Sequence, residues 1–135
     1  MSEAPEPFAM KAPTIVIIES PYAGDVAANV DYARAACRDS YERGEVPFAS
    51  HLFYTQFMDD RDPVERMAGI ECGYAMWWNA TKIVFYIDRG WSAGMQAALR
   101  RVKALTSHEV EYRCLKVIEG TENVRIDPRK NEVSE

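Results

Sequence analysis

A chain of 135 residues is long enough for one domain with its own core and too short for two ordinary domains. Its 47% hydrophobic and 27% charged residues are typical of a globular protein, and its apolar runs, such as residues 15–18, are far shorter than the roughly 20 residues of a membrane-spanning helix. The net charge of −5 argues against a nucleic-acid partner, because binding a phosphate backbone requires clustered Lys and Arg.

The start of the chain has no basic region followed by an apolar stretch, so we expect no secretory signal and a cytoplasmic protein. Cys37, Cys72 and Cys114 form no CxxC pair, which predicts reduced thiols. The two histidines, His51 and His108, lie far apart in the sequence, so we expect neither a metal site nor a cofactor.

In the first third of the chain, residues 1–13 are expected to form a proline-containing tail. The β-branched run at residues 14–18 predicts a strand buried on both faces, and the Pro and Gly of residues 19–25 predict a loop. A helix is expected to follow and to end before Gly44. Its apolar positions at helical spacing are Val26, Val30, Ala33, Cys37 and Tyr41.

The middle of the chain predicts a short strand within residues 46–54 and then a helix. Asp62 is a predicted N-cap, Pro63 suits the first helical position, and Glu65 would complete a capping box. The inward positions of this helix are Met67, Ile70, Tyr74 and Trp77, and Trp78 is also expected in the core.

In the last third, residues 83–87 predict a second buried strand, a helix follows from Ser92, and residues 110–118 predict another strand. The expected inward positions of the helix are Met95, Leu99, Val102 and Leu105. We therefore expect one domain at residues 14–120, with residues 121–135 forming a tail or an arm onto a neighbouring copy.

Alternating strands and helices predict an α/β fold, a flavodoxin- or Rossmann-like three-layer sandwich with a mostly parallel sheet of four or five strands. In such folds, ligands bind beyond the carboxyl ends of the strands. The candidate site therefore lies at the loops of residues 19–25 and 88–94.

Residues 88–94 lead into a predicted helix N-terminus, where free amides, glycines and the Ser92 hydroxyl could hold a phosphate or carboxylate. Alternatively, Ser92 is an ordinary N-cap. Ser20, Pro21 and Tyr22 form a second candidate for an anion or a sugar, with Asp25 as a helix cap. His51 is either a half-buried, hydrogen-bonded residue or a ligand contact.

Longer segments carry a family resemblance. Residues 15–38 read IVIIESPYAGDVAANVDYARAACR, residues 44–73 read GEVPFASHLFYTQFMDDRDPVERMAGIECG, and residues 92–95 form a Ser-x-Gly-Met turn. In this order they resemble the nucleoside 2-deoxyribosyltransferase-like superfamily, in particular its small bacterial and phage branch.

The resemblance implies a flavodoxin-like fold that binds a nucleoside or nucleotide. Active members cleave or exchange the N-glycosidic bond of a deoxynucleoside or its 5′-monophosphate, using a glutamate nucleophile and an assisting aspartate. By the resemblance, Ser92 and Gly94 fit the phosphate positions and Tyr22 fits the sugar-side aromatic, while Asn29, His51 and Arg66 match residues typical of the branch. The candidate ligand-binding residues are Ser20, Pro21, Tyr22, Asp25, His51, Arg66, Ser92, Gly94 and Met95.

Both family carboxylates are absent at the matching positions, because Ala98 stands at the nucleophile's place and Thr81 at the aspartate's. Retaining cleavage requires two carboxyl groups about 5 Å apart. We therefore expect a pseudoenzyme that binds a nucleotide or a nucleotide-like molecule, as a sensor or a sequestering protein, with little glycosidase activity.

Two other hypotheses stay open. A deoxyribosyltransferase or deoxynucleoside 5′-monophosphate N-glycosidase could use a relocated carboxylate, Glu19 or Asp88, although Glu19 could instead accept hydrogen bonds from its loop or from Arg66. A pure assembly module would have its pocket filled by Met95 or Trp91. The resemblance also implies a homodimer or a higher homo-oligomer, to which exposed aromatics in residues 53–57 could contribute.

Overall fold

The structure, a computed structural model, describes residues 13–115. Within this range the chain forms a four-stranded parallel sheet in the order β2-β1-β3-β4. The strands are β1 (Ile15–Glu19), β2 (Val46–Phe48), β3 (Lys82–Tyr86) and β4 (Glu109–Arg113).

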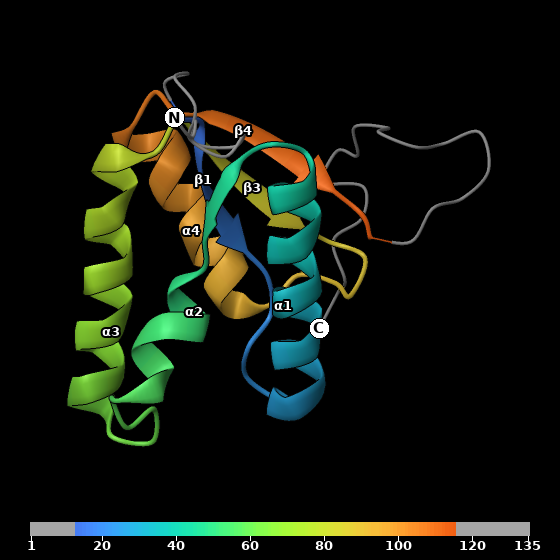
Figure 1. Cartoon of the computed structure of the whole chain (residues 1–135). Helices are drawn as coiled ribbons and strands as arrows, with labels where there is room; N and C mark the ends of the chain where they lie inside the picture. Colours follow the sequence, from blue (N-terminus) through green and yellow to red (C-terminus); the bar gives the residue numbers. More distant parts are fainter. Residues whose placement is uncertain (1–12, 116–135) are drawn as a thin grey trace, which may run out of the picture.

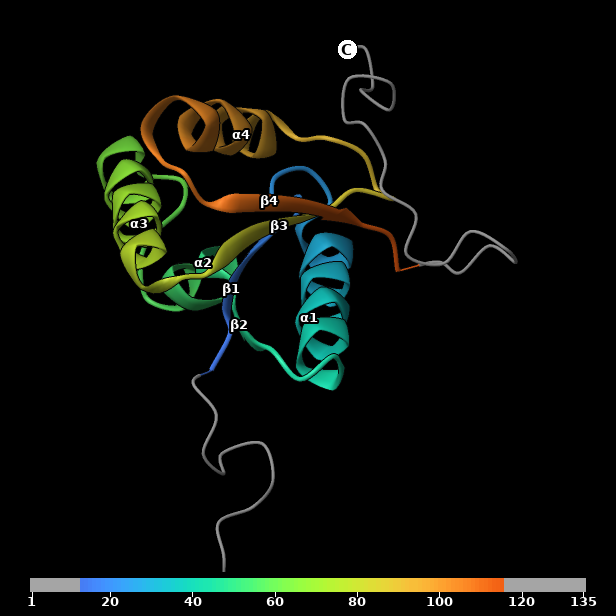
Figure 2. The same cartoon turned by 90° about the horizontal axis from the view of Figure 1, so that it is seen from above.

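The helices lie on both faces of this sheet. They are α1 (Val26–Glu42), α2 (Ser50–Phe53), α3 (Pro63–Ala75) and α4 (Ala93–Leu105), with short 3₁₀ helices η2 (Tyr54–Gln56) and η3 (Met76–Asn79). α1 covers one face, and α3 and α4 cover the other (Figures 1 and 2). Right-handed crossovers require this division, because the chain moves one way from β1 to β2 and the opposite way from β2 to β3 and β4. The expected three-layer α/β fold is confirmed.

The core is divided between the two faces of the sheet. On the α4 side, Ile17, Ile83 and Phe85 pack with Trp91 and Met95. On the α1 side, the alternate positions Val16, Ile18, Val84 and Tyr86 pack with Ala36 and Ala49. Strands buried on both faces need apolar residues at every position, which explains their β-branched runs.

Helix starts were predicted well, with one correction. Asp25, Asp62 and Ser92 are N-caps whose side chains accept backbone hydrogen bonds. The capping box was wrong, because the Glu65 carboxylate accepts the backbone N–H of Asp59, at 2.7 Å, in the loop before the helix. At the other end of α1, Gly44 follows the C-cap with a φ of 88°, as its position predicted.

The buried face of α1 differs from the expectation. Asn29, Ala33, Ala36 and Ser40 are buried, whereas Val26 and Tyr41 are 40% and 48% exposed. Small side chains let the helix approach the sheet closely, so the buried face is not the one with the largest residues.

Three further residues that were predicted to be buried are exposed. In α4, Ala98 lies in the core and Leu105 is 67% exposed. In η3, Trp77 is buried but Trp78 is 87% exposed. In α3, Met67 is 53% exposed, because the inward side of this helix carries Gly69 and Gly73, against Tyr54 and Ser50.

The expected strand in residues 46–54 is only three residues long and leads into α2. The last strand ends at Arg113, and residues 116–118 of its expected range lie outside the described residues. No helix within residues 13–115 has the length and apolar composition needed to cross a bilayer.

Candidate functional site at the carboxyl edge of the sheet

The order of the strands reverses between β1 and β3. From β1 the chain proceeds to one edge of the sheet, and from β3 it proceeds to the other, so that the loops after these two strands diverge. In open parallel sheets this point forms the crevice in which ligands bind. The loops concerned are residues 20–25 and 87–92, which overlap the predicted loops of residues 19–25 and 88–94.

The first half of α1 joins these two loops. The side-chain amide of Asn29, a buried residue, donates to the carbonyls of Tyr22 (3.1 Å) and Ala23 (3.0 Å), and its oxygen accepts from Nε of Arg89 at 3.1 Å. The Tyr32 hydroxyl donates to the Asp88 carboxylate. Sequence reasoning marked Asn29 without a role and missed Tyr32 and Arg89, because nothing local in the sequence reveals contacts to residue 88 or 89.

Glu19 ends β1 and is half-buried. It follows Ile17 in the strand alternation, which directs it to the face covered by α3 and α4. Burial raises its pKa to about 8, and no hydrogen-bond donor within residues 13–115 pairs with it. It forms no ion pair with Arg66, so the expected role as an acceptor from Arg66 is not found. At this pKa the carboxyl group is mostly protonated at pH 7.

Ser20 and His51 form a pair at the start of the same loop. Ser20 is buried, and its Oγ lies 2.7 Å from Nε2 of His51 in α2. Burial lowers the pKa of His51 to about 4, so that the imidazole is neutral at physiological pH. The ring of Tyr22 meets the imidazole edge-on, with centroids 6.3 Å apart. The site thus holds an uncharged imidazole beside a hydroxyl and an aromatic ring.

The second loop begins at Asp88 and ends at the N-terminus of α4. Gly90 has a φ of 95°, a conformation that favours glycine. The Ser92 hydroxyl accepts the N–H of Met95 at 3.1 Å, which leaves the amides of Ala93 and Gly94 without partners inside the helix. The backbone at Gly94 is open, since an added Cβ would meet only Ser92 Oγ, at 3.8 Å.

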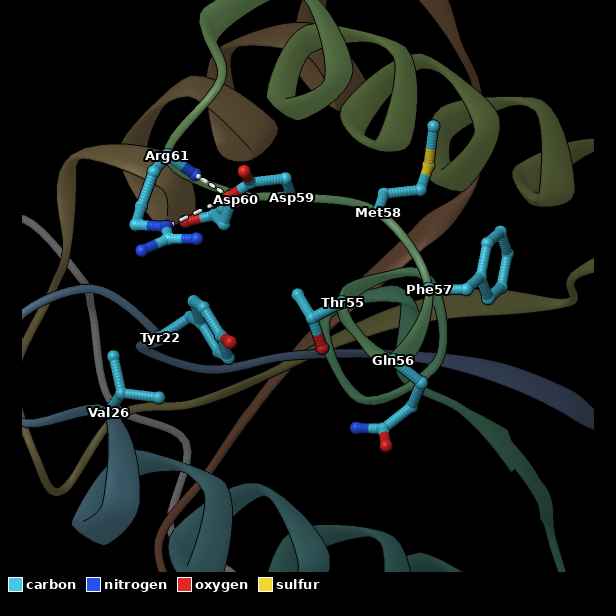
Figure 3. A pocket seen from close by; sticks show the side chains of 9 residues that line it. All are labelled: Tyr22, Val26, Thr55, Gln56, Phe57, Met58, Asp59, Asp60 and Arg61. Carbon is cyan, nitrogen blue, oxygen red and sulfur yellow. Dashed lines mark hydrogen bonds and ion pairs between the residues drawn. The ribbon is translucent and has the colours of Figure 1, made fainter.

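An open groove of about 600 Å³ lies beside Tyr22. One wall is formed by Tyr22 and Val26, and the other by residues 55–61 (Figure 3). Thr55 and Gln56 face Tyr22 and Val26 across the groove, whereas Phe57 points away, and Arg61 is paired with Asp59. Residues 53–57 were expected only as a possible oligomer contact, and no sequence signal linked residues 55–61 to Tyr22.

Several candidates do not contribute side chains to this arrangement. Met95 is buried in the core, as is Trp91, whose indole N–H has no partner within the described residues. The Asp25 carboxylate caps α1, and Arg66 is exposed on α3. Pro21 is buried next to Ser20.

The two positions at which the resemblance predicted catalytic carboxylates in the superfamily lie apart from each other. Ala98 lies on the buried side of α4, in the core. Thr81 precedes β3, and its N–H donates to the carbonyl of Ile15 at the amino end of β1, the opposite edge of the sheet. Within residues 13–115, no cluster of His, Cys, Asp and Glu is arranged to hold a metal ion.

The fold defines an open parallel α/β protein whose strand order reverses between β1 and β3. The chain belongs to the family described as a domain of unknown function, DUF7768, which matches residues 14–113. No curated protein and no solved structure matches the chain.

Proposed function

We propose that this protein binds a nucleotide or a nucleotide-like small molecule, as a sensor or a sequestering protein, with little glycosidase activity. The observation that carries the proposal is the reversal of strand order between β1 and β3, with Ser20, Tyr22 and His51 on one side and Ser92 on the other. This is where parallel α/β proteins bind ligands.

The two loops suit different parts of such a ligand. The amides of Ala93 and Gly94, which have no partner inside the helix, and the positive end of the α4 dipole favour a phosphate. Tyr22 and the adjoining groove offer an aromatic ring and polar groups to a planar base. The volume of the groove lies within the range of small-molecule sites.

The likeness to the deoxyribosyltransferase-like superfamily is part of this proposal. A methyl group at Ala98 cannot form a covalent intermediate, and Thr81 is at the wrong edge of the sheet to assist a reaction beside Ser92. Binding without turnover is therefore the activity that these residues support best.

The direct test is calorimetric titration with nucleoside 5′-monophosphates, cyclic nucleotides and the free nucleosides. We expect saturable binding of at least one phosphorylated ligand. An absence of heat at millimolar concentrations of every ligand would refute nucleotide binding.

A variant pair tests the phosphate position. Ser92→Asp keeps an N-cap acceptor but places a negative charge beside the amides, whereas Ser92→Ala removes the cap alone. We expect Ser92→Asp to weaken the binding of monophosphates at least tenfold more than that of free nucleosides. Ser92→Ala should affect the two ligand classes more equally. If Ser92→Asp weakened the binding of both ligand classes equally, the phosphate would not bind at this loop.

The second candidate function is N-glycosidase or deoxyribosyltransferase activity, which the raised pKa of Glu19 favours. A carboxyl that keeps its proton at pH 7 can protonate a departing base, although it cannot act as the nucleophile in that form. Asp88 is less suited, because it already accepts from Tyr32.

Chromatography of deoxynucleoside 5′-monophosphates incubated with the protein distinguishes the two functions. If the enzyme hypothesis holds, free base appears, the rate falls as the pH rises through about 8, and Glu19→Gln abolishes release. If no base is released by the wild type at any pH between 5 and 9, the enzyme hypothesis is wrong.

We also propose that the protein is cytoplasmic, of bacterial or phage origin, and a homodimer or a higher homo-oligomer. Phe53 and Phe57, 51% and 65% exposed, are consistent with contact to a neighbouring copy.

A further inference from the structure

Helix α3 has apolar residues on two opposite sides. Its inward side carries Gly69 and Gly73, which approach Tyr54 and Ser50. Its outward side carries Val64 and Met67, which are 77% and 53% exposed. Ala68, Cys72 and Ala75 continue this side at helical spacing, and Trp78, 87% exposed, follows in η3; we name these six residues the outer face of α3.

No described element covers the outer face. α3 lies at the edge of the molecule in both perpendicular views, with α2, α4 and the sheet on its inner side (Figures 1 and 2). A helix that is apolar on both sides is normally buried on both. Exposed apolar patches of several hundred Å² mark interaction sites rather than ordinary surface.

We propose that the outer face of α3 binds the same face of a second copy of this chain, in an antiparallel helix pair related by a two-fold axis. Bulky Trp78 lies at one end, Val64 at the other, and small Ala68, Cys72 and Ala75 lie between them. Small residues in the middle let two helices approach closely.

The direction of the pair follows from the position of the tryptophan. In an antiparallel pair centred near Glu71, Trp78 of each copy lies over Val64 of the other, and Ala75 lies opposite Met67 or Ala68. In a parallel pair the two Trp78 side chains would meet and separate the helices at that end. Antiparallel helix dipoles are also favourable.

The size of the face fits a dimer of modest affinity. Val64, Met67 and Trp78 together expose on the order of 400 Å², and the small residues between them add to it, against roughly 800 Å² per partner in a standard interface. We therefore expect a dimer with a dissociation constant in the micromolar range, which dilution separates.

Glu71 is the one charged residue within the outward spacing of α3, and it lies near the proposed two-fold axis. Two copies would bring two Glu71 carboxylates together, which disfavours association. Glu71→Gln should therefore strengthen the dimer, whereas a charge added at Met67 should weaken it. A surface unrelated to association would show neither effect.

Sedimentation velocity of the full chain over a hundredfold range of concentration tests the proposal. We expect a monomer–dimer equilibrium in the wild type, at least tenfold weaker association in Met67→Glu and in Trp78→Glu, and stronger association in Glu71→Gln. Tyr41→Glu is the matched control, because Tyr41 is 48% exposed on α1, on the opposite face of the sheet. A wild type that stays monomeric throughout, or association that Met67→Glu leaves unchanged, would overturn the proposal.

Cysteine cross-linking supplies a second, independent readout. Cys72 is exposed in the middle of the outer face, whereas Cys37 and Cys114 are half-buried and burial raises the pKa of both thiols, that of Cys37 to about 11. A short bismaleimide at pH 7 should therefore link two copies through Cys72, and Cys72→Ser should abolish the link. Cross-linking that persists in Cys72→Ser would place the interface elsewhere.

Discussion

Glu19 is a carboxyl group whose surroundings oppose its ionisation. It lies under α3 and α4, where burial raises its pKa to about 8, and its charge adds to burial in raising the pKa of Tyr74. In the unfolded chain the same group ionises near pH 4.5. Between these values the folded state binds more protons than the unfolded state, so Glu19 lowers stability as the pH rises from 4.5 to 8.

We therefore predict that Glu19→Gln stabilises the protein at high pH. The gain should be about 4 kcal/mol at pH 8 and should approach zero at pH 4.5, because the amide mimics the protonated acid. Urea denaturation at both pH values measures it. A Glu19→Gln gain that does not vary with pH would contradict the raised pKa of Glu19.

The pKa of His51 is shifted in the opposite direction to that of Glu19. Burial lowers its pKa to about 4 from 6.5, so its imidazole should remain neutral while the solution is acidified through pH 6 and 5. Since the unfolded chain binds this proton more readily, stability contributed by neutral His51 is lost as the pH falls from 6.5 towards 4. NMR titration of the imidazole carbons should show no transition above pH 5. A transition near pH 6.5 would mean that the ring is hydrated.

At the scale of elements, α2 and α3 approach each other closely at a glycine, Gly73. A Cβ at Gly73 would lie 2.7 Å from Oγ and 2.8 Å from Cβ of Ser50, at the start of α2. A Cβ at Gly69, one turn earlier, would make ordinary contacts of 3.5 and 3.6 Å with Met58 and Tyr54. The two glycines thus form a matched pair on one helix.

Gly73→Ala should destabilise the protein by about 1–3 kcal/mol, because α2 must move, even though alanine favours the helix. Gly69→Ala should be neutral or slightly stabilising for the same reason of helix propensity. Chemical denaturation of both variants measures the difference. Gly73→Ala tolerated as well as Gly69→Ala would show that α2 and α3 do not pack this closely.

At the scale of the whole molecule, four charged residues join segments distant in sequence. Arg113, buried at the end of β4, pairs with Glu45 before β2 and with Glu111, and Lys82 at the start of β3 pairs with both carboxylates. Burial opposes ionisation of Glu111, but hydrogen bonds from Arg113 and Lys82 outweigh it and hold its pKa at about 2. The same partners lower the pKa of Glu45.

Arg113→Met should cost about 3–5 kcal/mol, because it leaves buried carboxylates without their main partner. In the wild type, the stability that Glu111 contributes is present above pH 4.5 and lost as the pH falls towards 2. Arg38→Met, which breaks an exposed pair with Glu42, should cost less than about 1 kcal/mol. Thermal denaturation of both variants measures these losses of stability. Equal losses in the two variants would mean that the network around Arg113 does not stabilise the protein.

The sequence by itself determined the parallel α/β fold, the helix N-caps and the two loops that form the candidate site. These features depend on local chemistry: β-branched runs form buried strands, Asp and Ser accept the free amides of a first turn, and Pro and Gly end strands. Ser20, Tyr22 and Ser92 could be proposed as ligand contacts for that reason, since each follows a strand or begins a helix.

Only the tertiary structure decided which helix faces are buried and which groups meet. Ser20 and His51 are 31 residues apart, and their contact depends on how α2 packs against β1. The raised pKa of Glu19 depends on its burial in the folded protein, which no local pattern records. Packing also determined that Met67 and Trp78 are exposed. The side of α3 that carries Gly69 and Gly73 packs closely against the neighbouring residues Tyr54 and Ser50, so the larger apolar residues face solvent.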